Sequence, residues 1–111
     1  MSPRARTAAL GRMRHRKGCE FERQVARMYE EAGYDVRGLE AGGDLLCLRK
    51  GRQTVAVECK RQERLKLPEW LAQMERDAPS GAASVLVFKQ SFQPIYAVQR
   101  LEQYLEELKR C

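Results

Sequence analysis

The stretch DLLCLRKGRQTVAVECK, residues 44–60, decides the fold, because it has the pattern of two strands joined by a tight turn. Apolar residues fill both halves, and KGR at 50–52 between them is a hairpin signal. Asp44 opens the first strand, while Glu58 and Lys60 close the second. Charged side chains at the ends of apolar strands need a structural or a chemical reason.

Strand alternation predicts where these charges lie. Side chains two residues apart share one face of a strand, so Glu58 and Lys60 point the same way and Cys59 points the opposite way. With a turn over residues 50–52, Asp44 lies nearly opposite Glu58 in an antiparallel hairpin. The two carboxylates and the ammonium group can therefore converge.

Two converging carboxylates repel each other unless a cation or a shared proton offsets the repulsion. Mg²⁺ is a natural partner, because it takes oxygen ligands and is usually held by one or two carboxylates together with substrate phosphate. A lysine beside it can orient or deprotonate water and neutralise phosphate charge, as phosphodiester hydrolysis requires. A simple ion pair of Glu58 with Lys60 at a strand end is the structural alternative.

The other segments alternate between helical and extended patterns. Apolar residues recur at helical spacing over 17–32, Pro68 suits the first turn of a second helix, and a third helical pattern closes the chain. Strands are expected at 34–38, 44–49, 53–60, 83–89 and 94–98. The order αβββαββα predicts an α/β fold, with a mixed sheet of about five strands flanked by helices.

The composition indicates one small domain. The chain has 111 residues, 43% of them apolar, and neither an apolar run of about 18 residues nor a signal-peptide core, so we expect a cytoplasmic protein. Its four cysteines form no C-x-x-C pair and His15 is the single histidine, which argues against zinc. We expect reduced cysteines, with Cys47 and Cys59 as small buried fillers.

All of the excess charge lies at the N-terminus. Residues 1–17 carry six basic residues and no acid, and this accounts for the whole net charge of +6. We expect residues 1–16 to form a basic, flexible arm that is drawn to nucleic-acid phosphate, ahead of a single domain over 17–111. A solubilising tail and an organelle presequence are the alternatives.

Three segments resemble a known family: RKGCEFERQVARMYEEAGYDVRG (16–38), AGGDLLCL (41–48) and VAVECK (55–60). Together they are similar to the PD-(D/E)XK nuclease superfamily and, within it, to the archaeal-type Holliday junction resolvases. Those enzymes open with a basic residue, Lys-Gly and a Glu-Arg pair on the first helix, and carry Asp and Glu-x-Lys on the next two strands. The similarity continues more loosely through 83–89.

The resemblance implies a restriction-endonuclease-like core and a Mg²⁺-dependent, structure-selective endonuclease that acts as a homodimer on four-way DNA, with Mn²⁺ able to substitute. Glu22 would be the helix-borne acid of the site and Arg23 a DNA contact. Asp44 and Glu58 would hold the metal together with Glu22, and Lys60 would be the catalytic lysine.

Some positions depart from the family pattern. Arg37 matches the family's strand-one arginine only approximately, and the loop LEAGG (39–43) lacks the serine that these resolvases often carry. Glu40 is an extra acid, and Glu20 competes with Glu22, which we prefer because it stands directly before an arginine.

Further DNA contacts are expected from position: Arg14, Arg16 and Lys17 in the arm, and Arg61, Arg64 and Lys89 near the strand ends, with solvated surface charge as the alternative. Apolar residues of the middle helix (Trp70, Leu71, Met74) and of the closing helix (Leu101, Leu105, Leu108) are expected in the core, or else in a dimer contact. Besides a resolvase, the sequence leaves open another nuclease of this fold, such as a nickase or a repair endonuclease, and a non-catalytic nucleic-acid-binding protein.

Overall fold

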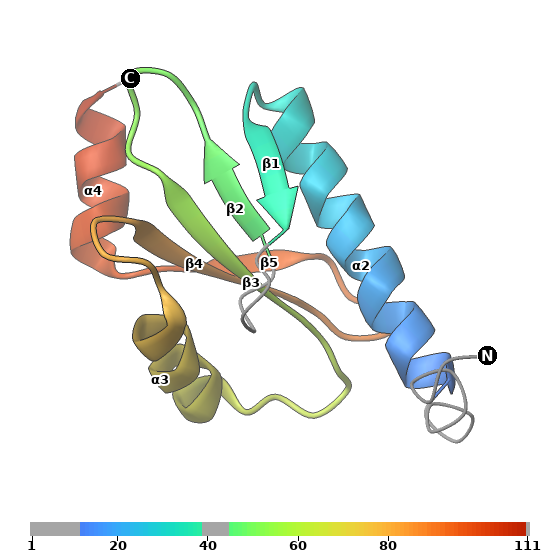
Figure 1. Ribbon diagram of the computed structural model, residues 1–111. Helices are drawn as coiled ribbons and strands as arrows, with labels where there is room; N and C mark the ends of the chain where they lie inside the picture. Colours follow the sequence, from blue (N-terminus) through green and yellow to red (C-terminus); the bar gives the residue numbers. More distant parts are fainter. Residues whose placement is uncertain (1–11, 39–44, 111) are drawn as a thin grey trace.

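A computed structural model describes residues 12–38 and 45–110, with side chains from residue 18 onward, as a five-stranded sheet flanked by helices (Figure 1). The predicted α/β class and the order αβββαββα are confirmed. None of the helices in the described ranges is long and apolar enough to cross a membrane. The elements are α2 (Arg12–Glu31), β1 (Asp35–Gly38), β2 (Leu45–Leu48), β3 (Val55–Arg61), α3 (Leu67–Asp77), β4 (Ala83–Lys89), β5 (Tyr96–Val98) and α4 (Leu101–Lys109).

The sheet combines antiparallel and parallel pairing in the order β1-β2-β3-β4-β5. The predicted hairpin joins β2 to β3 through a turn in which Gly51 has φ 77°, a left-handed value that glycine adopts without strain. β3 and β4 are parallel because α3 crosses between them, and Lys60 pairs with Phe88 in this register.

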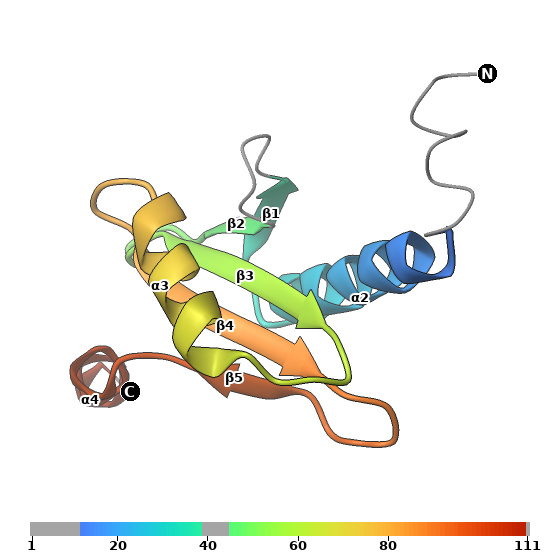
Figure 2. The same ribbon diagram turned by 90° about the horizontal axis from the view of Figure 1, so that it is seen from below.

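Alternating residues of the central strands build two separate cores on opposite faces. Val57 and Val87 pack with Phe21 and Val25 of α2. On the other face, a second cluster joins Leu86 and Phe88 of β4 to Trp70 and Met74 of α3. The expectation that Trp70 and Met74 lie in the core is thus confirmed, and Leu71 packs against the same cluster. Figure 2 shows α3 lying along β3 and β4, and α2 on the other side of the sheet.

The first helix begins at Arg12, five residues before the predicted start at Lys17. Residues 12–16 of the expected flexible arm are therefore helical, while residues 1–11 lie outside the described part. The prediction rested on apolar residues at helical spacing, and the turns before Lys17 are mostly polar and basic; arginine, methionine and lysine there still favour helix.

β2 carries apolar residues on both faces, which predicts that both are covered, but the structure buries only one of them. Leu45 and Cys47 are buried against α2, but Leu46 and Leu48 are only half-buried. The reason lies in the crossover, because α3 packs on β4 and does not extend over β2.

Cys47 is fully buried and Cys59 partly so, and neither forms a disulfide. Burial raises the pKa of the Cys47 thiol to about 11, so it stays protonated near neutral pH and serves as a small apolar filler. Burial likewise raises the pKa of the Tyr29 hydroxyl.

The core prediction for the closing helix was also wrong. Leu101, Leu105 and Leu108 are 69%, 46% and 49% exposed, so the apolar stripe of α4 faces away from the sheet. The polar side of α4 faces inward instead: the Gln103 amide accepts from the Ser84 N–H at 3.3 Å and donates to the Ser84 carbonyl at 3.1 Å. These two bonds to the β4 backbone fix which side of α4 faces the sheet. The helical spacing of the leucines shows that they share one side but does not show which way that side points.

Candidate active site

The predicted Glu-x-Lys pair lies on β3, on the face that α3 covers. Glu58 is 4% exposed, and its Oε1 lies 3.5 Å from Nζ of Lys60, whose side chain is 18% exposed. The strand alternation inferred from the sequence thus brings this acid and this base together. The pair is largely dehydrated, so the attraction between its charges is stronger than between surface charges.

A third side chain holds the lysine. Nζ of Lys60 donates a hydrogen bond to Oε1 of Gln73 at 3.3 Å, and Gln73 comes from α3. Sequence reasoning did not select Gln73. The signal that could have found it is its place on α3 between Trp70 and Met74, the two residues that pack this helix on the sheet.

Asp44 lies outside the described residues, so its predicted position opposite Glu58 stays a prediction. The pairing of β2 with β3 is described up to Leu45, the residue directly after Asp44. Leu45 pairs with Val57, the residue directly before Glu58. In the part of the chain that is described, no group of three acids, cysteines or histidines could hold a metal ion. A metal site with three such protein ligands that includes Glu58 would need one of them from outside this part.

The helix-borne acid lies on α2 beside two core anchors. Phe21 and Val25 are buried in the α2 core, which holds Glu22 half-buried near the sheet and leaves Arg23 exposed. Glu20 is exposed. The two acids differ in exposure, and the motif-based preference for Glu22 stays a prediction.

Three of the expected DNA contacts lie at the surface or near it. Arg37 is exposed and pairs with Asp35 across 3.3 Å. Arg64 is exposed on the loop before α3. Lys89, which is half-buried, donates from Nζ to the carbonyl of Gln90 at 3.2 Å. The side chains of Arg14, Arg16 and Lys17 and the whole of Glu40 lie outside the described part.

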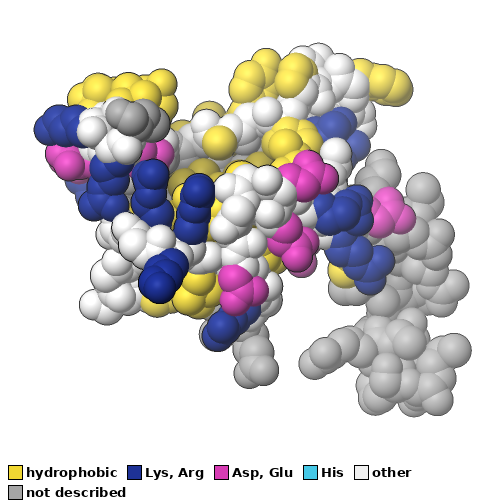
Figure 3. All heavy atoms as spheres, turned by 90° about the horizontal axis from the view of Figure 1, so that it is seen from above, with side chains coloured by type: hydrophobic (Ala, Val, Ile, Leu, Met, Phe, Trp, Pro, Cys, Tyr) yellow, Lys and Arg dark blue, Asp and Glu magenta, His cyan; other side chains and the backbone are white. Residues whose placement is uncertain are grey.

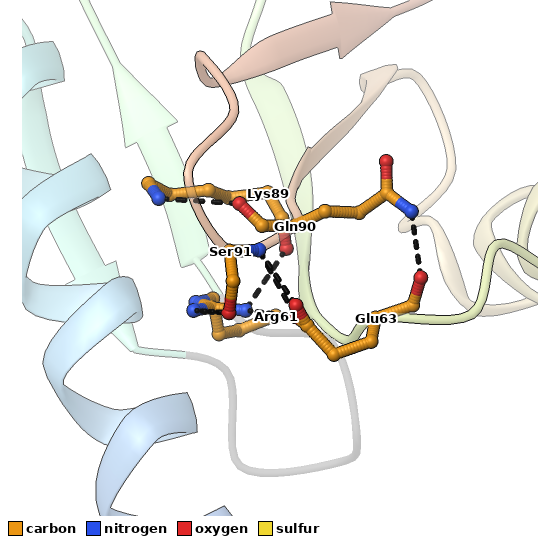
Figure 4. Close-up of polar contacts among 5 residues, drawn as sticks. All are labelled: Arg61, Glu63, Lys89, Gln90 and Ser91. Atoms are coloured by element: carbon orange, nitrogen blue, oxygen red, sulfur yellow. Dashed lines mark hydrogen bonds and ion pairs between the residues drawn. The ribbon is translucent and has the colours of Figure 1, made fainter.

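Arg61 belongs to a network that joins two loops at the ends of β3 and β4 (Figure 4). Its guanidinium donates to the Glu63 carboxylate at 3.2 Å and to Oγ of Ser91 at 3.1 Å. The same carboxylate accepts from the Ser91 N–H at 2.7 Å, and the Gln90 amide donates to the Glu63 carbonyl at 2.6 Å. Only 15% of the Arg61 side chain is exposed, so in this arrangement it mainly fixes the two loops to each other.

A groove of about 460 Å³ lies away from Glu58 and Lys60, at the end of the sheet where β3 and β4 begin. Arg52, Arg100 and Arg110 line it together with Glu106 and Glu107 of α4, and basic side chains gather at this end of the molecule (Figure 3). The groove contains neither Glu58 nor Lys60. Its mixed charges do not form the set of converging acids that metal-assisted hydrolysis needs.

No model of a protein family matches the sequence, and no curated protein matches it. Among solved structures, the chain matches Hjc of Archaeoglobus fulgidus, a Holliday junction resolvase from an archaeal hyperthermophile. The match covers 75% of this chain and 72% of Hjc, with 22% sequence identity and a TM-score of 0.55. The chain shares its fold with Hjc. The resemblance to the archaeal-type resolvases is confirmed at the level of the fold.

The Hjc fold comparison gives the strand pair a context. Glu58 and Lys60 lie on β3, the second strand of the hairpin, as the sequence pattern predicts. A sequence identity of 22% to Hjc supports a shared fold and does not by itself assign chemical roles to Glu58 and Lys60.

The Glu63 network predicts a pH dependence of stability. Hydrogen bonds from Ser91 lower the pKa of the Glu63 carboxyl from its ordinary value of 4.5 to about 2. Because the folded pKa is depressed, the stabilisation is present above about pH 4.5 and is lost as the pH falls toward 2. We expect the melting temperature of wild type to fall more steeply over this range than that of Glu63→Gln.

Thermal unfolding followed by circular dichroism from pH 2 to pH 6 measures this difference. Glu75→Gln, which removes an exposed carboxylate on α3 outside the Glu63 network, is the matched control and should follow the wild-type curve. Parallel curves for wild type and Glu63→Gln would show that the network does not stabilise the fold.

Proposed function

We propose that the protein is a Mg²⁺-dependent endonuclease that cuts four-way DNA junctions. The observation that carries the proposal is the Glu58 carboxylate, 4% exposed and 3.5 Å from the Lys60 ammonium, on the second strand of the hairpin in a fold shared with a resolvase. A DNA substrate is consistent with the cytoplasmic location expected from the sequence.

Stability alone gives a weak reason to keep this pair. Removing a carboxylate and an ammonium group from water costs several kcal/mol for each ion, and apolar residues of similar volume often stabilise a fold at least as well. The neighbouring residues Val57 and Leu86 show that apolar side chains pack readily in these strands. A role in chemistry gives a stronger reason for ionisable groups at this place.

The donor set fits a hard divalent cation. Glu58 supplies carboxylate oxygens, Asp44 stands next in the chain to the partner of Val57, and Glu22 is held half-buried on α2. We propose these three acids as the ligands of Mg²⁺, for which Mn²⁺ can substitute because it prefers the same oxygen ligands. The bound ion would activate water and neutralise phosphate charge.

Lys60 is proposed to act next to these acids. Gln73 and Glu58 fix its Nζ at 3.3 Å and 3.5 Å, so the ammonium is positioned before substrate arrives. A positioned ammonium can orient the attacking water and stabilise the charge that develops on the phosphate. Gln73 is a positioning residue, since it acts through the lysine.

These roles predict the effect of removing either charged group. Glu58→Gln and Lys60→Met should each lower the rate of junction cleavage by about a hundredfold or more, while junction binding survives. Cleavage of a labelled synthetic four-way junction in Mg²⁺, compared with a linear duplex of the same sequence, measures the rates. We expect Mn²⁺ to support cutting and a chelator to stop it.

Glu75→Gln, an exposed change on α3, is the control and should cut like wild type. Equal cutting of junction and duplex would instead indicate another nuclease of this fold. Binding without any metal-dependent cutting would indicate a non-catalytic DNA-binding protein.

The basic start of α2 is proposed to contact DNA phosphate. Arg14, Arg16 and Lys17 follow one another closely on a helix that begins at Arg12, and no acid accompanies them before Glu20. Arg23 is exposed further along the same helix. Each phosphate neutralised by such residues releases counterions, which makes binding depend on salt.

The triple variant Arg14→Gln, Arg16→Gln, Lys17→Gln should therefore bind junctions more weakly and flatten the salt dependence. If all three residues contact phosphate, the slope of log K against log salt falls by about 2.7. The charge-conserving triple Arg14→Lys, Arg16→Lys, Lys17→Arg is the matched control and should keep the wild-type slope. An unchanged slope in the glutamine variant would show that this segment does not touch phosphate.

Two copies are proposed to act together. A four-way junction has two-fold symmetry, and cutting two opposing strands needs two sites. We assign the centre of the contact to the exposed apolar stripe of α4. When two α4 helices pack antiparallel, Glu102 near the start of one helix lies beside Lys109 near the end of the other, so the charges at the rim are complementary.

A stable dimer buries about 800 Å² per partner, so surface next to α4 must add to the contact. Leu105→Glu places a charge in the stripe and should raise the dimer dissociation constant at least about tenfold. Sedimentation velocity over a concentration series measures it. Leu65→Glu, at another exposed leucine, should leave the constant unchanged, and an equal effect of both variants would contradict the assignment to α4.

A further inference from the structure

Phe92 is an aromatic residue that the fold holds entirely in solvent. Its side chain is 100% exposed, and its backbone has φ 62°. This left-handed region is uncommon for any residue other than glycine and is a genuine outlier for a bulky one. Among the described residues it is the one non-glycine residue with a positive φ. Neither burial nor backbone preference explains a phenylalanine here.

The loop around Phe92 is anchored from both sides. Ser91, the preceding residue, donates its N–H to the Glu63 carboxylate at 2.7 Å and receives a hydrogen bond from Arg61 on Oγ at 3.1 Å. The Gln93 N–H, on the following side, closes a turn onto the Gln90 carbonyl at 3.2 Å. These bonds hold the backbone that presents the ring, so the exposure follows from an ordered turn; Figure 4 shows the bonds made by Ser91.

This loop lies at the edge of the sheet where the candidate active site is found. Phe88 of β4 pairs with Lys60 of β3, and Phe92 follows four residues later. A chain extends at most about 3.6 Å per residue and paired strands lie about 4.8 Å apart, which places Phe92 within about 20 Å of Lys60 along the backbone. That span corresponds to no more than about six base pairs.

The surroundings suit DNA better than a dry protein contact. The Glu63 network ties the Phe92 loop to the segment that precedes α3, which carries exposed Arg64 and Lys66. Cations beside a protruding ring can contact phosphate while the ring meets a base. Aromatic rings stack on any unpaired base, because every base has a π face.

We propose that the Phe92 ring stacks on a base exposed at the branch point of a DNA junction and so favours branched over linear DNA. In a linear duplex each base is already stacked between its neighbours, and insertion of a ring must first separate them. Bases next to a branch point lack that continuous stacking and are open to the ring. The inference rests on the proposed function, since it names how the same protein selects its substrate.

Phe92→Gly separates the role of the ring from the role of the fold. Glycine adopts φ 62° without strain, so the melting temperature should stay the same or rise. Affinity for a four-way junction should fall about tenfold, whereas affinity for linear duplex should not change. Binding is measured in a chelator, where no cutting occurs, by anisotropy of labelled DNA. Phe92→Trp keeps an aromatic ring and should retain wild-type affinity.

A fluorescent base analogue gives a direct readout. Junctions that carry 2-aminopurine next to the branch point should show quenched fluorescence with wild type and with Phe92→Trp, and much less quenching with Phe92→Gly. The analogue placed in an arm, far from the branch point, is the control and should respond alike to all three proteins.

The outcomes distinguish this inference from the proposed function. If wild type binds and cuts junctions but Phe92→Gly binds them equally well, stacking by Phe92 is overturned and the nuclease proposal stands. If Phe92→Gly weakens self-association and leaves junction binding intact, the ring contacts a second copy instead. If wild type does not prefer junctions over duplex, both proposals fail.

Discussion

The contact between Glu58 and Lys60 is the constraint on which the rest of the structure depends. A carboxylate that is 4% exposed must be compensated, and the ammonium 3.5 Å away does so because an extended strand puts the two side chains on one face. The hairpin with β2 pairs β3 over residues 55–57, and the parallel pairing with β4 continues through Glu58 and Lys60. The α3 crossover then covers the pair and adds Gln73 as a second partner of the lysine. The fold therefore positions the charges before any ligand binds.

The two ends of the sheet have different characters. Where β3 and β4 end, the Glu63 carboxylate joins two loops, and the ordered turn beyond β4 presents Phe92 to solvent. Where the same strands begin, basic and acidic side chains line a groove beside α4. The acid and the lysine lie toward the first end, in keeping with the general preference of ligands for the carboxyl ends of parallel strands.

The sequence predicted the chain order of the elements and most of the strand geometry. Strand period, turn chemistry and helix stops are local properties that neighbouring residues determine. They correctly predicted the hairpin at residues 50–52, the strand over 83–89 and the side-by-side placement of Glu58 and Lys60. Helix boundaries were less certain. The first helix begins five residues before its predicted start at Lys17, because the turns before Lys17 are basic and carry no apolar period that would mark them as helical.

By itself the sequence determined the α/β class and the shared face of the Glu-x-Lys pair, because both depend on periods of two or of about 3.6 residues within one segment. Only the tertiary structure decided which faces are covered. α3 covers β4 and leaves part of β2 open, the Gln103 bonds to Ser84 turn the stripe of α4 outward, and Gln73 reaches Lys60 from another element. Each of these results depends on how separate segments pack in space, and no pattern within one segment contains that information.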